Sequence, residues 1–113
     1  MITGYPETTP WGGYVVWKDG SILDHRPSLK IYNHSPDGFA WGYGGSGPSQ
    51  LALAILLEYT DRKFAVSHYQ DFKADVIAKL PKDHEFTLTD YEIARWCETH
   101  GWLNIKQTVG KGI

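Results

Sequence analysis

The sequence predicts an α+β fold, with an N-terminal antiparallel sheet of three to four strands packed on three C-terminal helices. Apolar residues recur with a period of about two before Trp41 and of about 3.6 after it, as strands and helices require. The expected strands precede the expected helices instead of alternating with them, which favours separate layers. A length of 113 residues favours a single domain, residues 1–113.

The sheet is expected within residues 14–43, after an irregular lead-in at residues 1–13 that is rich in Pro, Gly and Thr. Asp19 followed by Gly20 is typical of a tight turn and predicts a hairpin. A second turn is expected where proline, aspartate and glycine follow one another at residues 35–38. The four expected strands cover residues 14–17, 21–24, 28–33 and 39–41.

A helical layer is expected over residues 47–100. Its first helix has Pro48 in the first turn, where a missing N–H is tolerated, with Ser46 or Gly47 as the cap. The run of Leu, Ala and Ile that follows leaves little polar surface, so this helix should be buried nearly all round.

Two further helices complete the predicted layer. The second begins near Asp61 and ends at Pro81, because a proline cannot continue a helix. The third begins at Asp90, since Thr89 and Glu92 have the spacing of a capping box. Residues 104–113 are polar and contain glycine, and we expect a flexible tail there.

Composition excludes several classes of partner. Eleven basic and thirteen acidic residues give a net charge of −2, which argues against general binding to nucleic acid. The longest apolar run is too short for a membrane span, and the first residues lack the pattern of a signal peptide. A single cysteine, Cys97, fits a reducing compartment. We therefore expect a cytoplasmic protein without a membrane partner.

A glycine-rich segment, residues 42–47, joins the expected sheet to the first helix. Its glycines match a dinucleotide fingerprint, but a second helix follows where that unit needs a parallel strand. The spacing of a phosphate loop is also present, with Pro48 in place of the essential lysine. Pro48 likewise breaks the nucleophile-elbow pattern around Ser46, which is better interpreted as a cap or turn hydroxyl.

Two interpretations of this segment remain open. The glycines can fix a tight corner between strand and helix, which is the favoured interpretation. Alternatively, free N–H groups at the helix start can bind a carboxylate or phosphate. The candidate residues for such an anion site are Tyr43, Gly44, Gly45, Ser46 and Gly47.

For the remaining candidate side chains, a structural role is a simpler interpretation than catalysis or metal binding. His68, Asp71 and Asp75 share one face of the expected second helix, but a solvated polar face is the simpler interpretation than a metal site. Cys97 lies on an apolar stripe without a histidine at motif spacing, which predicts a buried thiol. No catalytic residue, metal ligand or cofactor is predicted.

Three stretches of the chain resemble an uncharacterised family of small bacterial and phage proteins. They cover residues 33–57, which include the glycine-rich segment and the following Gln-Leu-Ala-Leu-Ala, then residues 68–73, and then residues 86–89. The resemblance implies a prokaryotic or mobile-element origin. It implies no catalytic residues, because none are established for that family.

Three functions are carried forward from these observations. The favoured one is a non-enzymatic protein-interaction module, such as a phage-encoded or mobile-element-encoded inhibitor or regulator of a host defence protein. Its candidate contacts are the aromatic residues Trp11, Trp17 and Tyr43. The alternative is a protein that binds a small anionic ligand or nucleotide at the glycine-rich segment. A hydrolase or transferase comes third, because the chain lacks a recognisable nucleophile and base.

Overall fold

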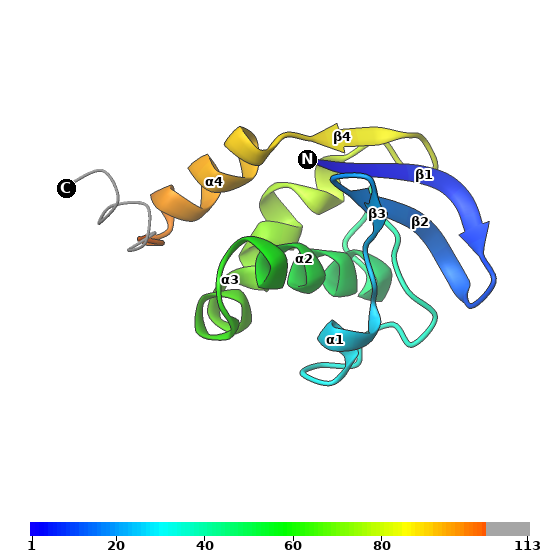
Figure 1. Ribbon diagram of the computed structural model, residues 1–113, viewed down its shortest axis with the longest axis horizontal. Coiled ribbons are helices and arrows are strands. Elements are labelled where there is room, and N and C mark those ends of the chain that lie inside the picture. The colour runs from blue at the N-terminus through cyan, green and yellow to red at the C-terminus, as the bar shows by residue number, and fades with distance from the viewer. Residues whose placement is uncertain (104–113) are drawn as a thin grey trace.

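The computed structural model describes residues 1–103 and has the predicted α+β architecture. Its sheet has four antiparallel strands in the order β3-β2-β1-β4. Helices α2 and α3 lie on one side of that sheet, and α4 extends from the end of β4 (Figure 1). The strands are β1 (Ile2–Thr9), β2 (Gly12–Lys18), β3 (Ser21–Ile22) and β4 (Phe86–Leu88), and the helices are α1 (Arg26–Leu29), α2 (Ser46–Tyr59), α3 (Arg62–Asp75) and α4 (Asp90–Thr99).

The expected irregular lead-in at residues 1–13 is wrong, because β1 occupies most of it. β1 pairs with β2 on one side and with β4 on the other. The proline that suggested irregular structure, Pro6, lies where the register with β2 shifts between Tyr5 and Thr8. A bulge tolerates a residue without an N–H, so the proline interrupts the pairing without ending the strand.

Two other expected strands are also corrected within residues 14–43. Residues 28–33 form the end of α1 and a turn, in which the amides of Ile31 and Tyr32 donate to the carbonyl oxygen of Ser28. Pro27 lies in the first turn of α1, where its fixed φ suits a helix. Of residues 39–41, only Phe39 pairs with the sheet, as an isolated bridge to Tyr14. The hairpin at residues 19–20 is confirmed by the pairing of β2 with β3.

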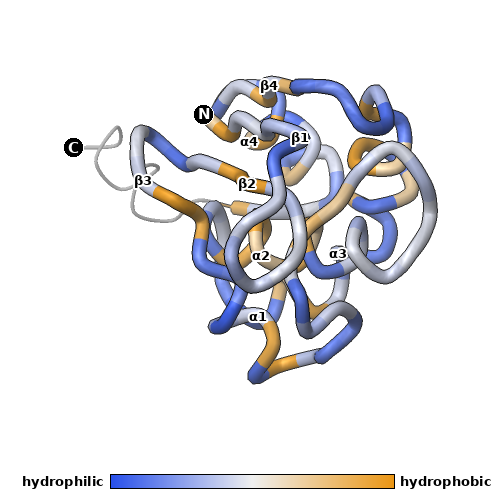
Figure 2. The backbone as a smooth tube through the Cα atoms, turned by 90° about the vertical axis from the view of Figure 1, so that its right-hand side faces the viewer, coloured by the Kyte–Doolittle hydropathy of each residue, from blue (hydrophilic) through white to orange (hydrophobic). Residues whose placement is uncertain are grey.

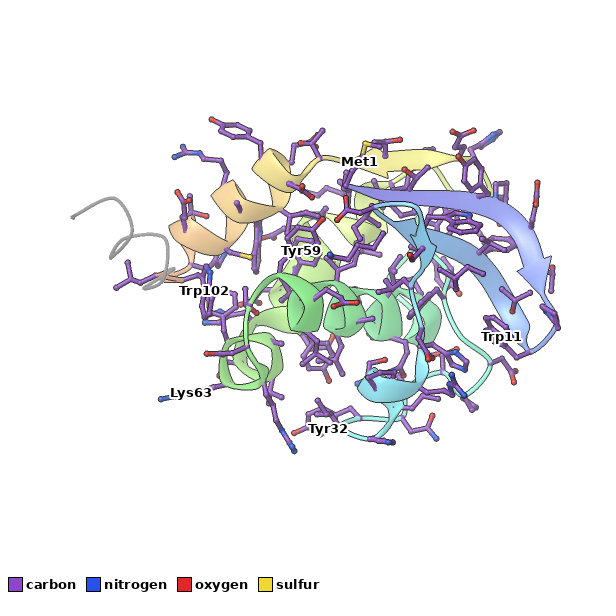
Figure 3. All side chains as sticks on the ribbon, in the orientation of Figure 1. Met1, Trp11, Tyr32, Tyr59, Lys63 and Trp102 are labelled. Atoms are coloured by element: carbon purple, nitrogen blue, oxygen red, sulfur yellow. The ribbon has the colours of Figure 1, made fainter. Side chains whose placement is uncertain are left out.

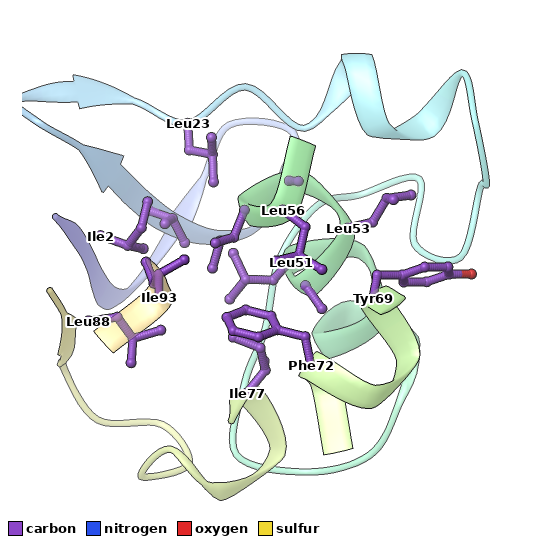
Figure 4. Close-up of a cluster of buried hydrophobic side chains, with 14 of the residues drawn as sticks. Ile2, Leu23, Leu51, Leu53, Leu56, Tyr69, Phe72, Ile77, Leu88 and Ile93 are labelled. Atoms are coloured by element: carbon purple, nitrogen blue, oxygen red, sulfur yellow. The ribbon is translucent and has the colours of Figure 1, made fainter. Parts of the chain in front are cut away.

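Helix α2 runs through the centre of the molecule, and its predicted burial is confirmed. Ten consecutive residues from Gly47 to Leu56 are buried. The strands contribute Ile2 and Val16 to the same core, which Figure 4 shows around the leucines of α2. In Figure 2, orange stretches mark hydrophobic residues in β2 and just after β3. The cap of α2 is Gly45 and not the predicted Ser46 or Gly47.

The expected helical layer at residues 47–100 is interrupted by a strand. Helix α3 begins after the predicted Asp61, whose side chain accepts a hydrogen bond from the Phe64 amide at 2.8 Å. It ends at Asp75, and a 3₁₀ turn (Ile77–Lys79) follows before Pro81. β4 then joins the sheet. The capping box of Thr89 and Glu92 at the start of α4 is confirmed.

Two further expectations concern the C-terminal tail and membrane-spanning helices. The predicted tail at residues 104–113 lies outside the described residues. Among residues 1–103, no helix is long and apolar enough to cross a membrane.

Helix α4 is joined to the rest of the structure through the end of α2. The Tyr59 hydroxyl donates a hydrogen bond to the Asp90 carboxylate, and the amino group of Met1 contacts both side chains. Figure 3 shows Met1 at the start of β1 and Tyr59 below it, on the side of the helices. Burial, followed by the hydrogen bond to Asp90, raises the pKa of Tyr59, so this phenol stays protonated at neutral pH.

One fully buried polar side chain, Gln50, connects α2 to the segment after β3. Its Nε2 donates to the Ser28 hydroxyl at 2.8 Å and to the Tyr32 carbonyl oxygen at 3.0 Å. Its Oε1 accepts from the amides of His34 at 2.8 Å and Ser35 at 3.0 Å. Both donors and both acceptor sites of the amide are thus used inside the protein. This side chain fixes the path of residues 28–35 against the central helix.

We predict that Gln50→Leu lowers the free energy of unfolding by about 3 kcal/mol, because it leaves several buried polar groups without partners. The measurement is urea denaturation followed by circular dichroism. Glu98→Leu is the control, since Glu98 is exposed on α4, and it should change stability by less than about 0.5 kcal/mol. Equal stability of the two variants would contradict a structural role for the Gln50 amide.

Candidate functional site

The glycine-rich corner is built around Gly42, which has a positive φ of 84°. Its amide donates to the carbonyl oxygen of Ile77 at 3.0 Å. A Cβ added at Gly42 would lie 2.4 Å from the Cα of Lys82, so a side chain has no room there. The chain therefore needs glycine here for both its backbone conformation and the close approach of a second segment.

The predicted anion-site residues differ in their accessibility. Gly44 and Ser46 are exposed, whereas Gly47 is buried against Ala40. The Tyr43 ring covers Gly45, since an added Cβ would lie 2.3 Å from that ring. Within residues 1–103, no amide of residues 44–47 donates a hydrogen bond to another protein group. The corner thus offers free N–H groups, but only part of it is open to a ligand.

The charges around the corner are mixed. The Lys82 amino group lies 5.3 Å from the centroid of the Tyr43 ring. Both residues line an open hollow of about 490 Å³, together with Tyr14 and the carboxylates of Asp37 and Asp83. The Tyr14 hydroxyl donates to Asp83 at 2.8 Å, which raises the pKa of Tyr14. Two carboxylates beside one ammonium group oppose the binding of an anion in this hollow. The geometry favours the structural interpretation of the corner.

The polar face expected on α3 forms contacts with α4 instead of a compact ligand set. The Asp75 carboxylate accepts from the indole N–H of Trp96 at 3.0 Å and lies 3.8 Å from His100. His68 packs against Phe64 with ring centroids 4.3 Å apart, and Asp71 is exposed. Within residues 1–103, no three histidine, cysteine or carboxylate side chains converge as metal ligands.

Cys97 lies on the inner face of α4 and is buried, as predicted. Burial raises the pKa of its thiol to about 11. The thiol is therefore protonated at neutral pH and is a poor nucleophile in the folded protein.

The sheet has an apolar face on the side opposite the core, and Trp17 lies at its centre. Cross-strand partners point to the same side of a sheet, and alternate residues point to opposite sides. Ile2 and Val16 point into the core, so the paired residues between them point outward. The outer sheet face consists of Ile22 paired with Trp17, Trp17 paired with Thr3, and Val15 paired with Tyr5.

This outer sheet face is accessible in the described part of the chain. Trp17, Val15 and Tyr5 are half-buried, and Ile22 retains 47% of its surface. None of the four belongs to the hydrophobic core or packs against it. The sequence reasoning identified Trp17 but missed its neighbours. Residues 1–13 were expected to be irregular, so Tyr5 had no predicted strand partner.

Trp11 lies at the tip of the β1–β2 hairpin (Figure 3). Its ring stacks on His25, with centroids 5.5 Å apart and an interplanar angle of 9°. Trp11, His25 and Ile22 line a hollow of about 510 Å³ together with the ion pair of Asp24 and Arg26. The hydrogen bonds from Arg26 hold the pKa of Asp24 at about 2. Ile22 thus pairs with Trp17 in the sheet and lines one hollow with Trp11. Tyr43 lines a separate hollow at the glycine corner.

Comparison with protein families identifies the chain over most of its length. A family model described as "Family of unknown function (DUF6166)" matches residues 6–99, and the chain belongs to this family. The matched region includes the glycine corner, Gln50, Trp11 and Trp17. No curated protein and no solved structure matches the chain.

We predict that Gly42→Ala costs about 3 kcal/mol of stability, since it combines backbone strain with overlap against the Lys82 backbone. Gly44→Ala is the matched control, because its Cβ would meet no atom within 4 Å. It should change stability by less than about 0.5 kcal/mol. Thermal unfolding measures both variants. An unchanged melting temperature for Gly42→Ala would contradict the structural role of the corner.

Proposed function

We propose that this protein is a non-enzymatic protein-interaction module whose partner binds to the outer sheet face. The observation that carries the proposal is the set of apolar side chains on that face. Tyr5, Val15, Trp17 and Ile22 lie on neighbouring strands and pack against no core residue in the described chain. Their contact with water is unfavourable, and a partner that covers them gains the free energy of apolar burial.

The composition of this surface supports protein binding over small-molecule binding. Tryptophan and tyrosine are enriched at the energetically dominant positions of protein interfaces. Trp11, at the tip of the hairpin, is 42% exposed and borders the same hollow as Ile22. The charged pair of Asp24 and Arg26 provides a polar rim beside these apolar residues, as is usual at interfaces.

The specific form of the proposal is an inhibitor or regulator of a host defence protein, encoded by a phage or another mobile element. This form rests on the sequence resemblance described above and on the small size of the chain. It specifies that the partner on the outer sheet face is a host protein. The surface proposal does not depend on it.

A second candidate function is the binding of a small anionic ligand or nucleotide at the glycine corner. The observation that favours it is the Lys82 ammonium beside the Tyr43 ring and the exposed Gly44 and Ser46. An aromatic ring next to a cation can hold a base and a phosphate. Asp37 and Asp83 in the same hollow oppose it.

Thermal-shift measurements with inorganic phosphate and with adenosine monophosphate distinguish the two functions. Because two carboxylates face the hollow, we expect millimolar concentrations of either compound to leave the melting temperature unchanged. Stabilisation that disappears in Lys82→Ala would instead assign the ligand site to the corner. Lys79→Ala, an exposed lysine on the 3₁₀ turn, is the control for a nonspecific effect of charge.

The main proposal is tested by capture from a lysate of the host organism with Trp17→Ser and with wild-type protein. We expect at least one protein to be recovered by the wild type and to fall about tenfold with Trp17→Ser, as loss of an interface anchor predicts. Tyr91→Ser is the matched control, because Tyr91 is 72% exposed on α4, away from the sheet face. Its recovery should equal that of the wild type. Equal recovery by folded Trp17→Ser would contradict the proposal.

A further inference from the structure

A second surface feature lies on the opposite side of the fold, between the segment after α1 and the first turns of α3. It is an open hollow of about 560 Å³, which we call the cationic hollow. Figure 3 shows Tyr32 and Lys63 projecting at this edge of the molecule. Its lining residues are Ile31, Tyr32, Arg62, Lys63, Val66 and Ser67.

The charge of the cationic hollow contrasts with that of the whole chain. Arg62 and Lys63 are exposed, and neither forms an ion pair with any residue among 1–103. The chain as a whole carries a net charge of −2. The nearest carboxylate along the chain, Asp61, accepts a hydrogen bond from the Phe64 amide at the start of α3. Two unpaired cations therefore stand together on a weakly acidic protein.

Tyr32 forms the aromatic side of this hollow, and its ring packs against a buried residue. The Tyr32 ring stacks on Tyr69, with centroids 5.9 Å apart and an interplanar angle of 21°. Tyr69 is buried, and its hydroxyl lies 2.6 Å from Nε2 of His34. The Gln50 amide in turn binds the carbonyl of Tyr32 and the amide of His34. Tyr32 nevertheless remains 46% exposed, so its ring is an ordered surface available for contact.

We propose that the cationic hollow binds an acidic segment of a partner protein, in which carboxylates flank an apolar or aromatic side chain. Arg62 and Lys63 would pair with the carboxylates, and the apolar side chain would lie against Tyr32, Ile31 and Val66. This inference rests on the proposed protein-binding function but uses a surface separate from the outer sheet face.

The openness of the hollow favours a peptide over a small molecule. Tyr32, Arg62, Lys63 and Ser67 are all exposed, so a small ligand would keep much of its surface in water, whereas small-molecule sites bury most of theirs. A protein segment is anchored by further contacts outside the hollow. Charge complementarity then selects an acidic segment over a basic one.

The test is an NMR titration of ¹⁵N-labelled protein with a capped hexapeptide of alternating glutamate and phenylalanine. We expect chemical-shift changes centred on Tyr32, Arg62 and Lys63, and weaker binding as salt is added. The double variant Arg62→Glu with Lys63→Glu should raise the Kd about tenfold or more, because it replaces attraction with repulsion. Lys79→Glu makes the same kind of change at an exposed lysine elsewhere and should raise it less than about twofold.

Several outcomes would overturn the inference. One is equal affinity for a peptide with lysine in place of glutamate. Another is an unchanged Kd in the double variant. Shifts of the same residues by inorganic phosphate at equal affinity would replace the acidic segment with a phosphate group.

The same variants separate this inference from the proposed function. Trp17→Ser should bind the acidic peptide as the wild type does, because Trp17 lies on the outer sheet face. Capture of a partner that is lost in Trp17→Ser but retained in the double variant would preserve the proposed function and overturn the cationic hollow.

Discussion

The buried amide of Gln50 is the interaction on which the arrangement of the surfaces depends. It lies in the most buried helix of the fold, and its four hydrogen bonds hold a segment that has little regular structure of its own. In a low-dielectric interior, such bonds are stronger than in water, and leaving any of them unmade is costly. Residues 28–35 can therefore follow one path, although they contribute neither a strand nor a long helix.

Both surfaces discussed above depend on the position of α2. At its N-terminus, the positive φ of Gly42 and its contact with Lys82 fix where the helix begins. Along its length, the helix packs against the inner side of the sheet, so the outer side is left for Tyr5, Val15, Trp17 and Ile22. Through Gln50 it also positions Tyr32 beside α3. The glycine corner is thus a structural requirement for both candidate binding surfaces.

The sequence predicted the elements whose signals are local. The capping box at Thr89 and Glu92, the helix start near Asp61 and the apolar run of α2 each depend on residues close together in the chain, and all were confirmed. β4 was missed because it pairs with β1 across more than eighty residues, as between Leu88 and Ile2. β1 was missed because its Pro, Gly and Thr residues favoured irregular structure, although it pairs with the neighbouring β2.

The residues of the candidate surfaces could likewise be predicted only where the signal lay in the local sequence. Trp17 was identified from its residue type, but its partners Tyr5 and Ile22 required the strand register. The cationic hollow could not be predicted from the sequence, since Tyr32 lines it beside Arg62 only in the folded chain, where Gln50 holds residues 28–35 against α2. The expected strand at residues 28–33 failed for a related reason. Pro27 and the Ser28 carbonyl favour a helical turn that the polar–apolar alternation does not reveal.

Hydrogen exchange of the His34 and Ser35 amides tests the central claim most directly. These two amides lie outside every helix and strand and donate only to the Gln50 side chain. If that side chain fixes the segment, their protection should lie within about tenfold of that of Ala54 in the core of α2. Exchange as fast as that of the exposed turn at Gly20 would contradict the account.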